Sequence, residues 1–136
     1  MDPRVWGPSI WFFIHSTALA YPESNPSPSI QSNYKLFFQQ LAKVLPCARC
    51  QKHFNQYVEN TIDSALQTRE ALFRWTVDAH NAVNKVLGKT IVPYEKAKKL
   101  VSDRYVQKRN RLQTIIPCLI LTFFIFVVLL LHFTDK

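Results

Sequence analysis

The segment 29-SIQSNYKLFFQQLAKVL-45 carries its large apolar residues at the spacing of a helix that buries one face. These residues are Tyr34, Phe37, Phe38, Leu41 and Leu45. Ser29 can cap the helix, because a serine hydroxyl accepts a hydrogen bond from a backbone N–H of the first turn. Pro46 interrupts the pattern, so we expect a helix over residues 30–45.

Further helices are predicted on both sides of this segment, separated by proline-rich breaks. Proline does no harm near a helix start, and glycine commonly follows a helix end, which suits Pro8 and Gly88. The other predicted helices cover residues 8–21, 47–60 and 69–87, and a fifth opens at Pro93. No segment shows strand alternation or an internal repeat. We therefore expect an all-α fold: a four-helix bundle with a short fifth helix, followed by a C-terminal transmembrane helix.

The composition excludes several classes of protein. The chain has 136 residues, which is enough for one small domain with an appendage. Only two residues are glycine, which argues against the glycine-dependent turns of Rossmann and P-loop folds. Three cysteines are too few for a secreted scaffold held together by disulfides.

Most of the net charge of +8 lies in one run near the C-terminus. Residues 96–111 contain seven Lys and Arg and a single acidic residue. Ile115–Phe133 follows without a charged side chain and would be roughly 28 Å long as a helix, close to the thickness of a bilayer core. We interpret 115–133 as a transmembrane anchor and 96–114 as a basic juxtamembrane helix. A buried core helix and a nucleic-acid-binding face are the alternatives for these two segments.

This arrangement predicts a single-pass, tail-anchored protein. The positive-inside rule keeps the basic flank, and the preceding domain with it, on the cytoplasmic side. No signal-peptide pattern precedes the first predicted helix. The predicted divisions of the chain are 1–95, 96–114, 115–133 and the short tail 134–136.

Cys47 and Cys50 form a Cys-Ala-Arg-Cys motif at a predicted helix start. A helix N-terminus stabilises a thiolate, and Arg49 and Lys52 add positive charge, so the pair can cycle between dithiol and disulfide. The alternative is a zinc site formed by Cys47, Cys50 and His53, although the second ligand pair of a structural zinc site is missing. A thioredoxin-like reductase does not fit, because no βαβ pattern surrounds the motif.

Two predicted helices carry aromatic and polar residues on one face. The first set is Gly7, Trp11 and His15, and the second is Trp75, His80, Asn81, Asn84 and Gly88. A single histidine on such a face is more often a structural group than a ligand. Two such faces near a redox motif, however, offer the ring stacking and amide hydrogen bonds that a flat heteroaromatic cofactor needs.

Three motifs together resemble the Erv/ALR family of FAD-linked sulfhydryl oxidases. They are Trp6-Gly7-Pro8 through Trp11 to His15, Pro46-Cys47-Ala48-Arg49-Cys50 followed by His53, and His80-Asn81-Ala82-Val83-Asn84-Lys85-Val86-Leu87-Gly88-Lys89. The resemblance covers about residues 4–95, and the third motif is the most specific. It implies a four-helix bundle that binds FAD, a homodimer, and an enzyme that oxidises thiols to disulfides while reducing O2 to H2O2.

The resemblance also implies roles for individual residues. Cys50 would pass electrons to the flavin, and Cys47 would exchange with the incoming dithiol. Trp11 and His80 would flank the FAD ring systems, and no residue is expected to bind a metal. The other FAD-binding positions implied are Gly7, His15, His53, Trp75, Asn81, Val83, Asn84, Leu87, Lys89 and Tyr94.

Two departures from the family pattern are informative. Cellular members carry a second, shuttle cysteine pair and a long-range structural disulfide, and this chain has cysteines for neither. Its electron donor is therefore expected to be a separate dithiol-bearing protein or a thioredoxin-like carrier. The small size and predicted anchor resemble the members of large DNA viruses, which implies a virion membrane or a host ER-derived membrane. The alternative function is a membrane-anchored zinc-binding adaptor without enzymatic activity.

Overall fold

The computed structural model describes the backbone of residues 1–134 and the side chains of residues 1–109, 111, 113 and 115–127. This part of the chain contains the helices α1 (Pro3–Leu19), α2 (Pro28–Val44), α3 (Ala48–Ala65), α4 (Arg69–Val86) and α5 (Tyr94–Thr134). The chain divides into two compact units, Met1–Ala97 and Lys98–Lys136. The prediction of an all-α fold is confirmed.

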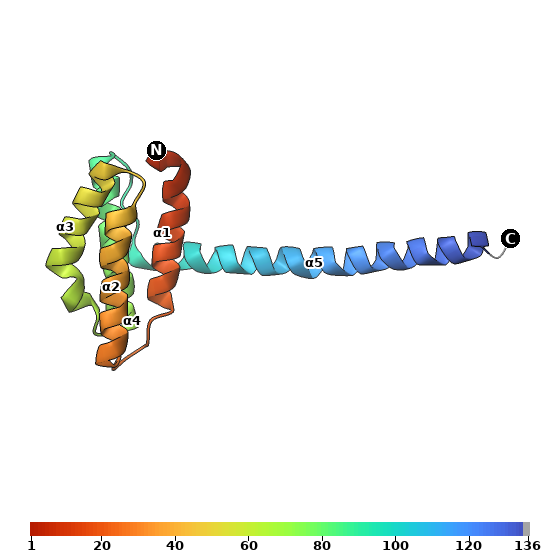
Figure 1. Cartoon of the computed structure of the whole chain (residues 1–136), viewed down its shortest axis with the longest axis horizontal. Coiled ribbons are helices and arrows are strands. Elements are labelled where there is room, and N and C mark those ends of the chain that lie inside the picture. Colours follow the sequence, from red (N-terminus) through yellow and green to blue (C-terminus); the bar gives the residue numbers. More distant parts are fainter. Residues whose placement is uncertain (135–136) are drawn as a thin grey trace. The chain divides into compact units, whose positions relative to one another are not determined.

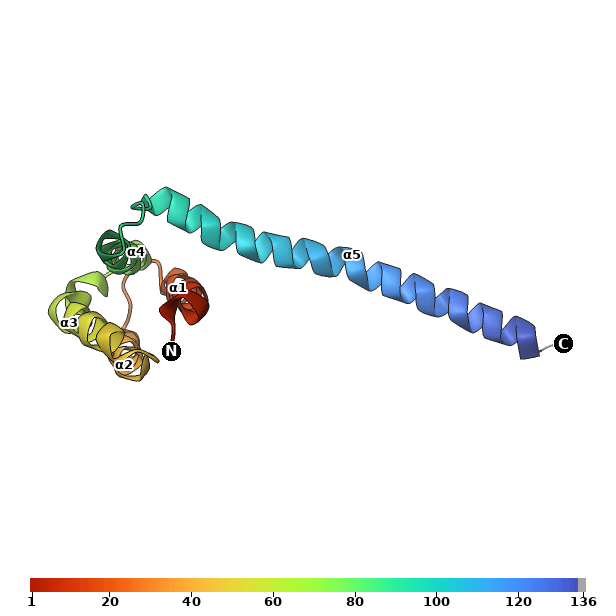
Figure 2. The same ribbon diagram turned by 90° about the horizontal axis from the view of Figure 1, so that it is seen from above.

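Helices α1 to α4 surround one hydrophobic core (Figures 1 and 2). Helix α1 packs against α4, α4 against α3, and α3 against α2. Helices α1 and α2 meet through Phe13 and Phe37, whose ring centroids are 5.8 Å apart. The largest fully buried side chains of the core are Tyr21, Phe38, Phe73, Ile14, Ile62 and Leu72. The predicted four-helix bundle is therefore present, and the apolar face of α2 points into it.

Helix α1 begins at Pro3, five residues earlier than predicted. Asp2 caps it, because its carboxylate accepts a hydrogen bond from Arg4 N at 2.8 Å. Pro3 occupies the first helical position, where a missing N–H has no cost, and Pro8 lies inside the helix. The proline that marks the start is thus Pro3, and not Pro8 as predicted.

Helix α2 also begins earlier than predicted, and for the same kind of reason. The capping residue is Ser27, and not Ser29, since the Ser27 hydroxyl accepts from Ile30 N at 3.3 Å. Pro28 follows directly as the first helical residue. In both helices, a capping side chain placed just before a proline fixes the start.

One end of the bundle joins α1 to α2 and α3 to α4, and lies at the bottom of Figure 1. Tyr21 is fully buried there, and its hydroxyl donates to Leu66 O at 2.9 Å. Arg69 donates from Nε to Tyr21 O at 2.6 Å and from its backbone N to Pro22 O at 3.0 Å. We call this end, with Tyr21, Pro22, Leu66 and Arg69, the closed end.

The opposite end contains the start of α1, the α2–α3 connection and the end of α4 (Figure 1). Gly88 follows α4 with a φ of +66°, as predicted for a C′ glycine. The backbone N–H of Gly88 donates to Lys85 O at 3.2 Å, and that of Lys89 to Asn84 O at 2.8 Å, so α4 ends in a Schellman motif. We call this end the site end, and it comprises residues 2–15, 45–54 and 76–92.

The C-terminal part of the chain differs from the prediction. Helix α5 is one helix of 41 residues, and not a short fifth helix followed by a separate transmembrane helix. Among the described residues, no helix offers an apolar stretch long enough to cross a membrane. The described part of the predicted anchor, residues 115–127, is about 20 Å long as a helix, which is shorter than a bilayer core of about 30 Å. Residues 128–133 of the predicted anchor lie outside the described side chains.

The predicted tail-anchored localisation is therefore contradicted. The positive-inside rule orients only chains that span the bilayer, so the cytoplasm-facing topology loses its basis as well. The assignment to a virion or ER-derived membrane falls with it. Within the basic run, Lys99 Nζ lies 2.9 Å from Asp103 Oδ2 on the exposed surface of α5.

Candidate active site

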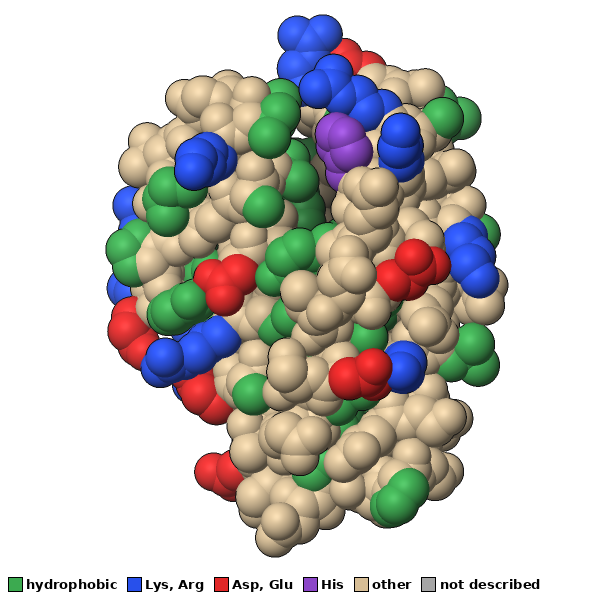
Figure 3. Space-filling view, turned by 90° about the vertical axis from the view of Figure 1, so that its left-hand side faces the viewer, with side chains coloured by type: hydrophobic (Ala, Val, Ile, Leu, Met, Phe, Trp, Pro, Cys, Tyr) green, Lys and Arg blue, Asp and Glu red, His purple; other side chains and the backbone are tan. Residues whose placement is uncertain are grey.

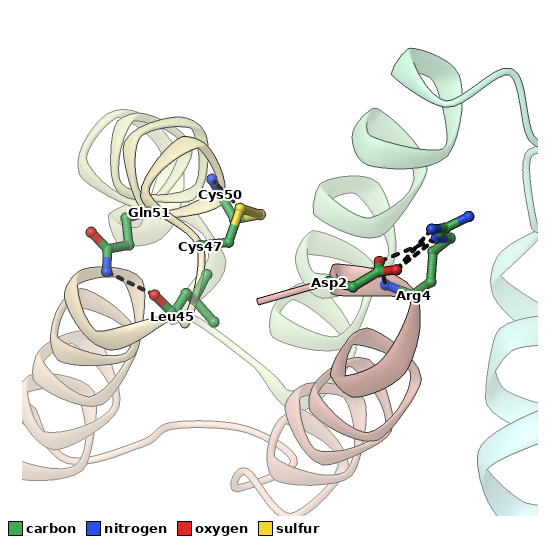
Figure 4. Close-up of a disulfide and its surroundings, with 6 residues drawn as sticks. All are labelled: Asp2, Arg4, Leu45, Cys47, Cys50 and Gln51. Carbon is green, nitrogen blue, oxygen red and sulfur yellow. Dashed lines mark hydrogen bonds and ion pairs between the residues drawn. A yellow bond between two sulfur atoms is a disulfide. The ribbon is translucent and has the colours of Figure 1, made fainter.

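A disulfide joins Cys47 and Cys50 at the start of α3 (Figure 4). The two Cα atoms are 5.2 Å apart, within the normal range for a disulfide. Cys47 is the N-cap residue of α3, and its sulfur accepts a hydrogen bond from Cys50 N at 3.3 Å. The two cysteines of the motif are therefore bonded to each other at a helix N-terminus.

The α2–α3 connection is held tightly to the first turn of α3. Gln51 donates from its side-chain Nε2 to Leu45 O at 2.7 Å (Figure 4), and Cys47 donates from its backbone N to the same oxygen at 2.7 Å. Cys50 is half-buried and packs against the hydrophobic core. Cys47 is half-buried as well, but Cys50 is the cysteine of the pair that packs against the core.

The surroundings of the disulfide favour negative charge. Arg49 and Lys52 are exposed near the start of α3, and its first turn has no acidic residue. Figure 3 shows Lys and Arg side chains gathered beside a histidine at the upper end of one face of the molecule. In the close-up of Figure 4, Arg4 at the start of α1 is already paired with Asp2 at 2.8 Å. A thiolate formed at the start of α3 would be stabilised by Arg49 and Lys52 and by the helix N–H groups.

Three aromatic rings from α1 and α4 contact one another where these two helices pack together. Trp11 and His80 stack with ring centroids 4.2 Å apart and planes inclined by 5°. The His15 and His80 ring centroids are 5.3 Å apart, and the two ring planes are inclined by 25°. We call Trp11, His15 and His80 the ring cluster. Because Trp11 and His80 stack directly on each other, the two rings do not face each other across an open gap.

Hydrogen bonds tie His15 of α1 to two residues of α4. His15 Nδ1 lies 2.9 Å from Thr76 Oγ1, and His15 Nε2 lies 3.1 Å from His80 Nδ1. Thr76 is fully buried and was not predicted as a site residue, although it lies four residues before His80 and so shares its helix face. Thr76 could have been predicted as a site residue from this four-residue spacing.

Both histidines are neutral at pH 7. Burial lowers the pKa of His15 to about 4, and the neighbouring His80 contributes to this effect. Burial also lowers the pKa of His80 to about 4, and the positive charge of Lys89 adds to it. The Schellman motif at the end of α4 thus leaves Lys89 close enough to influence the ring cluster.

Phe54 connects the disulfide with the ring cluster. It follows Cys50 by four residues on α3, so the two side chains lie on the same side of the helix. The Phe54 ring is buried and meets the Trp11 ring edge-on, with centroids 6.2 Å apart. The side of α3 that carries Cys50 therefore faces the ring cluster.

Two of the predicted FAD-binding residues have other partners. Trp75 is a core residue, and its Nε1 donates to Thr61 Oγ1 at 2.7 Å. The Tyr94 hydroxyl donates to Asp78 at 2.8 Å, and the Arg74 guanidinium lies 4.9 Å above the Tyr94 ring centre. Neither residue joins the ring cluster: Trp75 packs the core, and Tyr94 anchors the start of α5 to α4.

The asparagines at the end of α4 organise the chain that follows. Asn81 accepts from Val92 N and donates to Val92 O, both at 2.9 Å, so its amide holds the connection between α4 and α5. Asn84 is buried, and its Nδ2 lies 3.4 Å from Asn81 Oδ1. The remaining predicted positions, His53, Val83 and Leu87, are exposed.

The residues at the site end fit a flat, anionic cofactor such as FAD. Trp6 Nε1 is buried and has no acceptor among the described residues. Gly7 is buried, yet a Cβ added there would meet no atom within 4 Å, so there is space beside this part of α1. Trp11 and His80 supply an aromatic surface, and Lys89 supplies positive charge for phosphate groups.

The zinc alternative is not favoured. Both sulfurs of the motif are engaged in the disulfide, and zinc binds thiolates. Among the described residues, no group of three or more His, Cys, Asp and Glu side chains is placed to hold a metal ion.

Comparison with known proteins supports the fold and shows the family of the chain. Residues 8–105 match the model of the Erv1/Alr family. A probable FAD-linked sulfhydryl oxidase of Acanthamoeba polyphaga mimivirus is 36% identical over 114 residues, which cover 81% of this chain and 78% of the relative. The mitochondrial FAD-linked sulfhydryl oxidase ERV1 of Saccharomyces cerevisiae is 36% identical over 88 residues, 65% of this chain and 46% of the relative. The crystal structure of the FAD-binding domain of Erv1 from Saccharomyces cerevisiae aligns with a TM-score of 0.68 at 35% identity, and the match covers 76% of this chain and 96% of that chain.

Proposed function

The chain belongs to the Erv1/Alr family, and we infer from this that it is a FAD-linked sulfhydryl oxidase. It oxidises dithiols to disulfides and transfers the electrons to O2, which gives H2O2. The observation that carries this conclusion is the disulfide of Cys47 and Cys50 within the region that matches the family. The similarity to a mimivirus protein supports the predicted viral relationship.

We assign the exchange with substrate to Cys47 and the inner role to Cys50. A thiolate of the partner attacks the Cys47 sulfur, the Cys47–Cys50 bond breaks, and Cys50 leaves as a thiolate. The second thiolate of the partner then attacks the mixed disulfide, so the partner departs with a disulfide and Cys47 is released. Two electrons have moved from the partner to the Cys47–Cys50 pair. The packing of Cys50 against the core supports this order, because an incoming protein reaches the outer sulfur first.

The start of α3 favours the first of these steps. Exchange is faster when the leaving sulfur is a stable thiolate. The N–H groups of the first turn and the exposed cations Arg49 and Lys52 stabilise negative charge at this position. The enzyme therefore needs no separate acid to protonate Cys50 as it leaves.

We propose that the ring cluster and its neighbours hold the cofactor. Bound FAD supplies the two-electron chemistry that connects the dithiol with O2. Trp11 and His80 would contact its ring systems, Lys89 would pair with phosphate oxygens, and Trp6 Nε1 would donate a hydrogen bond. Gly7 leaves space for the cofactor, and Asn84, Val83 and Leu87 would complete the site from the end of α4.

The electron donor is proposed to be a separate dithiol-bearing protein. The chain has three cysteines, two of which form the Cys47–Cys50 disulfide, so it lacks a second pair that could relay electrons. The homodimer implied by the family resemblance stays a prediction, and the mass of the FAD-loaded full-length chain in solution would test it.

Purification of the full-length chain tests the function directly. The protein should be yellow, should consume O2 when a dithiol is added, and should release H2O2. Added FAD should raise the free energy of unfolding by about 2.7 kcal/mol at a hundredfold excess over Kd. A folded, colourless protein without oxidase activity would contradict the proposal, and stoichiometric zinc in that protein would favour the adaptor instead.

A further inference from the structure

A chain of hydrogen bonds runs from the backbone of α4 through Thr76 to both histidines of the ring cluster. The Thr76 hydroxyl lies 2.7 Å from Phe73 O, one turn earlier in α4, and 2.9 Å from His15 Nδ1. The other ring nitrogen of His15, Nε2, lies 3.1 Å from His80 Nδ1. Thr76 and His15 are buried, so water does not replace these contacts.

The number of available protons fixes the direction of this chain. The Thr76 hydroxyl has one hydrogen, and the Phe73 carbonyl can only accept, so this hydrogen lies between the two oxygens. His15 must then donate from Nδ1 to the Thr76 oxygen. In a neutral His15 the other nitrogen is an acceptor, so His80 must donate from Nδ1. Any other arrangement would leave two acceptors or two donors facing each other at a largely buried contact.

The surroundings keep both rings neutral and in place. Burial lowers the pKa of each histidine to about 4, and Lys89 disfavours a proton on His80. Trp11 stacks on His80 and fixes the plane of its ring. Nε2 of His80 therefore carries no proton, and among the described residues this nitrogen has no hydrogen-bond partner.

We propose that Thr76 is a positioning residue of the cofactor site: it holds His15, and through it His80, as Nδ1–H tautomers, so that His80 offers Nε2 as a hydrogen-bond acceptor to bound FAD. This inference rests on the proposed function. The complementary groups are the N–H groups of the FAD ring systems and the hydroxyls of its sugar parts. The opposite tautomer of His80 would present an N–H to such a donor, and the contact would become repulsive.

The first test reads the tautomers in the full-length chain without FAD. Nitrogen-15 NMR of labelled histidine distinguishes Nδ1–H from Nε2–H rings, and we expect the Nδ1–H form for His15 and His80. Thr76→Val keeps the shape of the side chain but removes the hydroxyl, so His15 and His80 should lose their fixed tautomer. Thr76→Ser restores the hydroxyl and should restore the Nδ1–H form. An Nε2–H form of either ring in the parent chain, or unchanged tautomers in Thr76→Val, would overturn the inference.

The second test measures FAD affinity. Thr76→Val should bind FAD about tenfold more weakly, which corresponds to the loss of one good hydrogen bond, whereas Thr76→Ser should stay close to the parent chain. Thr61→Val is the matched control, because the partly buried Thr61 hydroxyl likewise donates to a backbone oxygen, Tyr57 O at 2.6 Å, and accepts from Trp75 Nε1. It should lower stability without changing the tautomers or the FAD affinity.

The outcomes separate this inference from the proposed function. A parent chain that does not bind FAD would contradict the proposed function, while the NMR result would still report on the tautomers. A parent chain that binds FAD, together with a Thr76→Val variant that binds it equally well, would overturn the positioning role alone. An equal loss of affinity in Thr61→Val would show that only general stability had changed, and would overturn it too.

Discussion

The two ends of the α1–α4 bundle use polar groups in opposite ways. At the closed end, the Tyr21 hydroxyl and the Arg69 side chain donate to backbone oxygens of Leu66 and Tyr21, which joins the two connections to each other. At the site end, Trp6 Nε1 is buried without an acceptor among the described residues, and His80 Nε2 is left without a partner there. The polar groups of Tyr21 and Arg69 at the closed end find partners within the chain, whereas Trp6 and His80 at the site end keep a donor and an acceptor that a bound cofactor can satisfy.

This difference separates stability from activity within one small fold. A polar group that finds its partner inside the chain contributes to folding, and a group that is left unpaired has a cost that ligand binding can remove. Substitutions at the two ends should therefore affect different measurements. The predictions below test that separation, beginning with the largest effect.

The largest effect is expected for the cysteines of the site end. Cys47→Ser and Cys50→Ser should each reduce dithiol-driven O2 consumption at least a hundredfold, a loss of about 3 kcal/mol in transition-state stabilisation, because neither variant can form the disulfide. Both variants should still bind FAD. Cys118→Ser is the matched control, since Cys118 is a free, exposed cysteine, and it should keep full activity. A Cys47 or Cys50 variant with more than about a tenth of the parent activity would place the redox centre elsewhere.

The second-largest effect is expected at low pH, which should destabilise the site end. The folded-state pKa of His15, about 4, lies below its ordinary value of 6.5, so the unfolded chain binds protons first as the pH falls. The stabilising contribution is thus complete above about pH 6.5 and is lost towards pH 4, by about 3 kcal/mol for His15. Urea unfolding from pH 7 to pH 4 measures this loss. His15→Asn should show a shallower decline, and parallel curves for the two proteins would contradict the prediction.

A smaller effect is expected where α4 ends. Gly88→Ala places a side chain at a φ of +66°, and should lower the free energy of unfolding by about 1 kcal/mol. Because this turn positions Lys89 near the ring cluster, FAD affinity should fall as well. Gly88→Asn should be milder, since asparagine tolerates this conformation better. Thermal unfolding with and without FAD measures both effects, and an unchanged affinity in Gly88→Ala would separate Lys89 from the cofactor site.

The smallest effect is expected at the closed end. Tyr21→Phe removes the hydrogen bond to Leu66 O and should lower the free energy of unfolding by about 1 kcal/mol. FAD affinity and oxidase activity should stay at the parent level, because the change is confined to the other end of the bundle. A variant that lost FAD as well would show that the two ends are coupled.

The sequence predicted most of the fold, because helical spacing and helix ends are local properties. The apolar face of α2 and the glycine after α4 both depend on neighbours within a few residues, and both are confirmed. The starts of α1 and α2 were missed, since several Ser and Pro residues compete there and only the structure shows that Asp2 and Ser27 accept the hydrogen bonds. The predicted membrane anchor was wrong. It rested on the uncharged run of residues 115–133 alone, whereas the described helices contain no membrane-spanning stretch.

The candidate site was predicted in its chemistry and less well in its contacts. The faces carrying Trp11 and His80 were identified, and the structure brings these rings together. The sequence could not show that Asn81 holds Val92, or that Trp75 points into the core, because both depend on residues that are distant along the chain or on another helix. Thr76 was missed because its four-residue spacing from His80 places it on the same helix face but does not show which side chain it contacts.

The position of Cys47 as the N-cap residue of α3 has a consequence for how the family can diverge. The Cys47 sulfur both caps the helix and takes part in the disulfide. Selection for folding alone would accept Ser, Thr, Asp or Asn at position 47, since these residues are the usual helix caps. A lineage that abandons oxidation could therefore replace Cys47 by one of them in a single neutral change, and keep the bundle. In an alignment of the family, relatives that have lost the oxidase activity should then carry Ser, Thr, Asp or Asn at position 47.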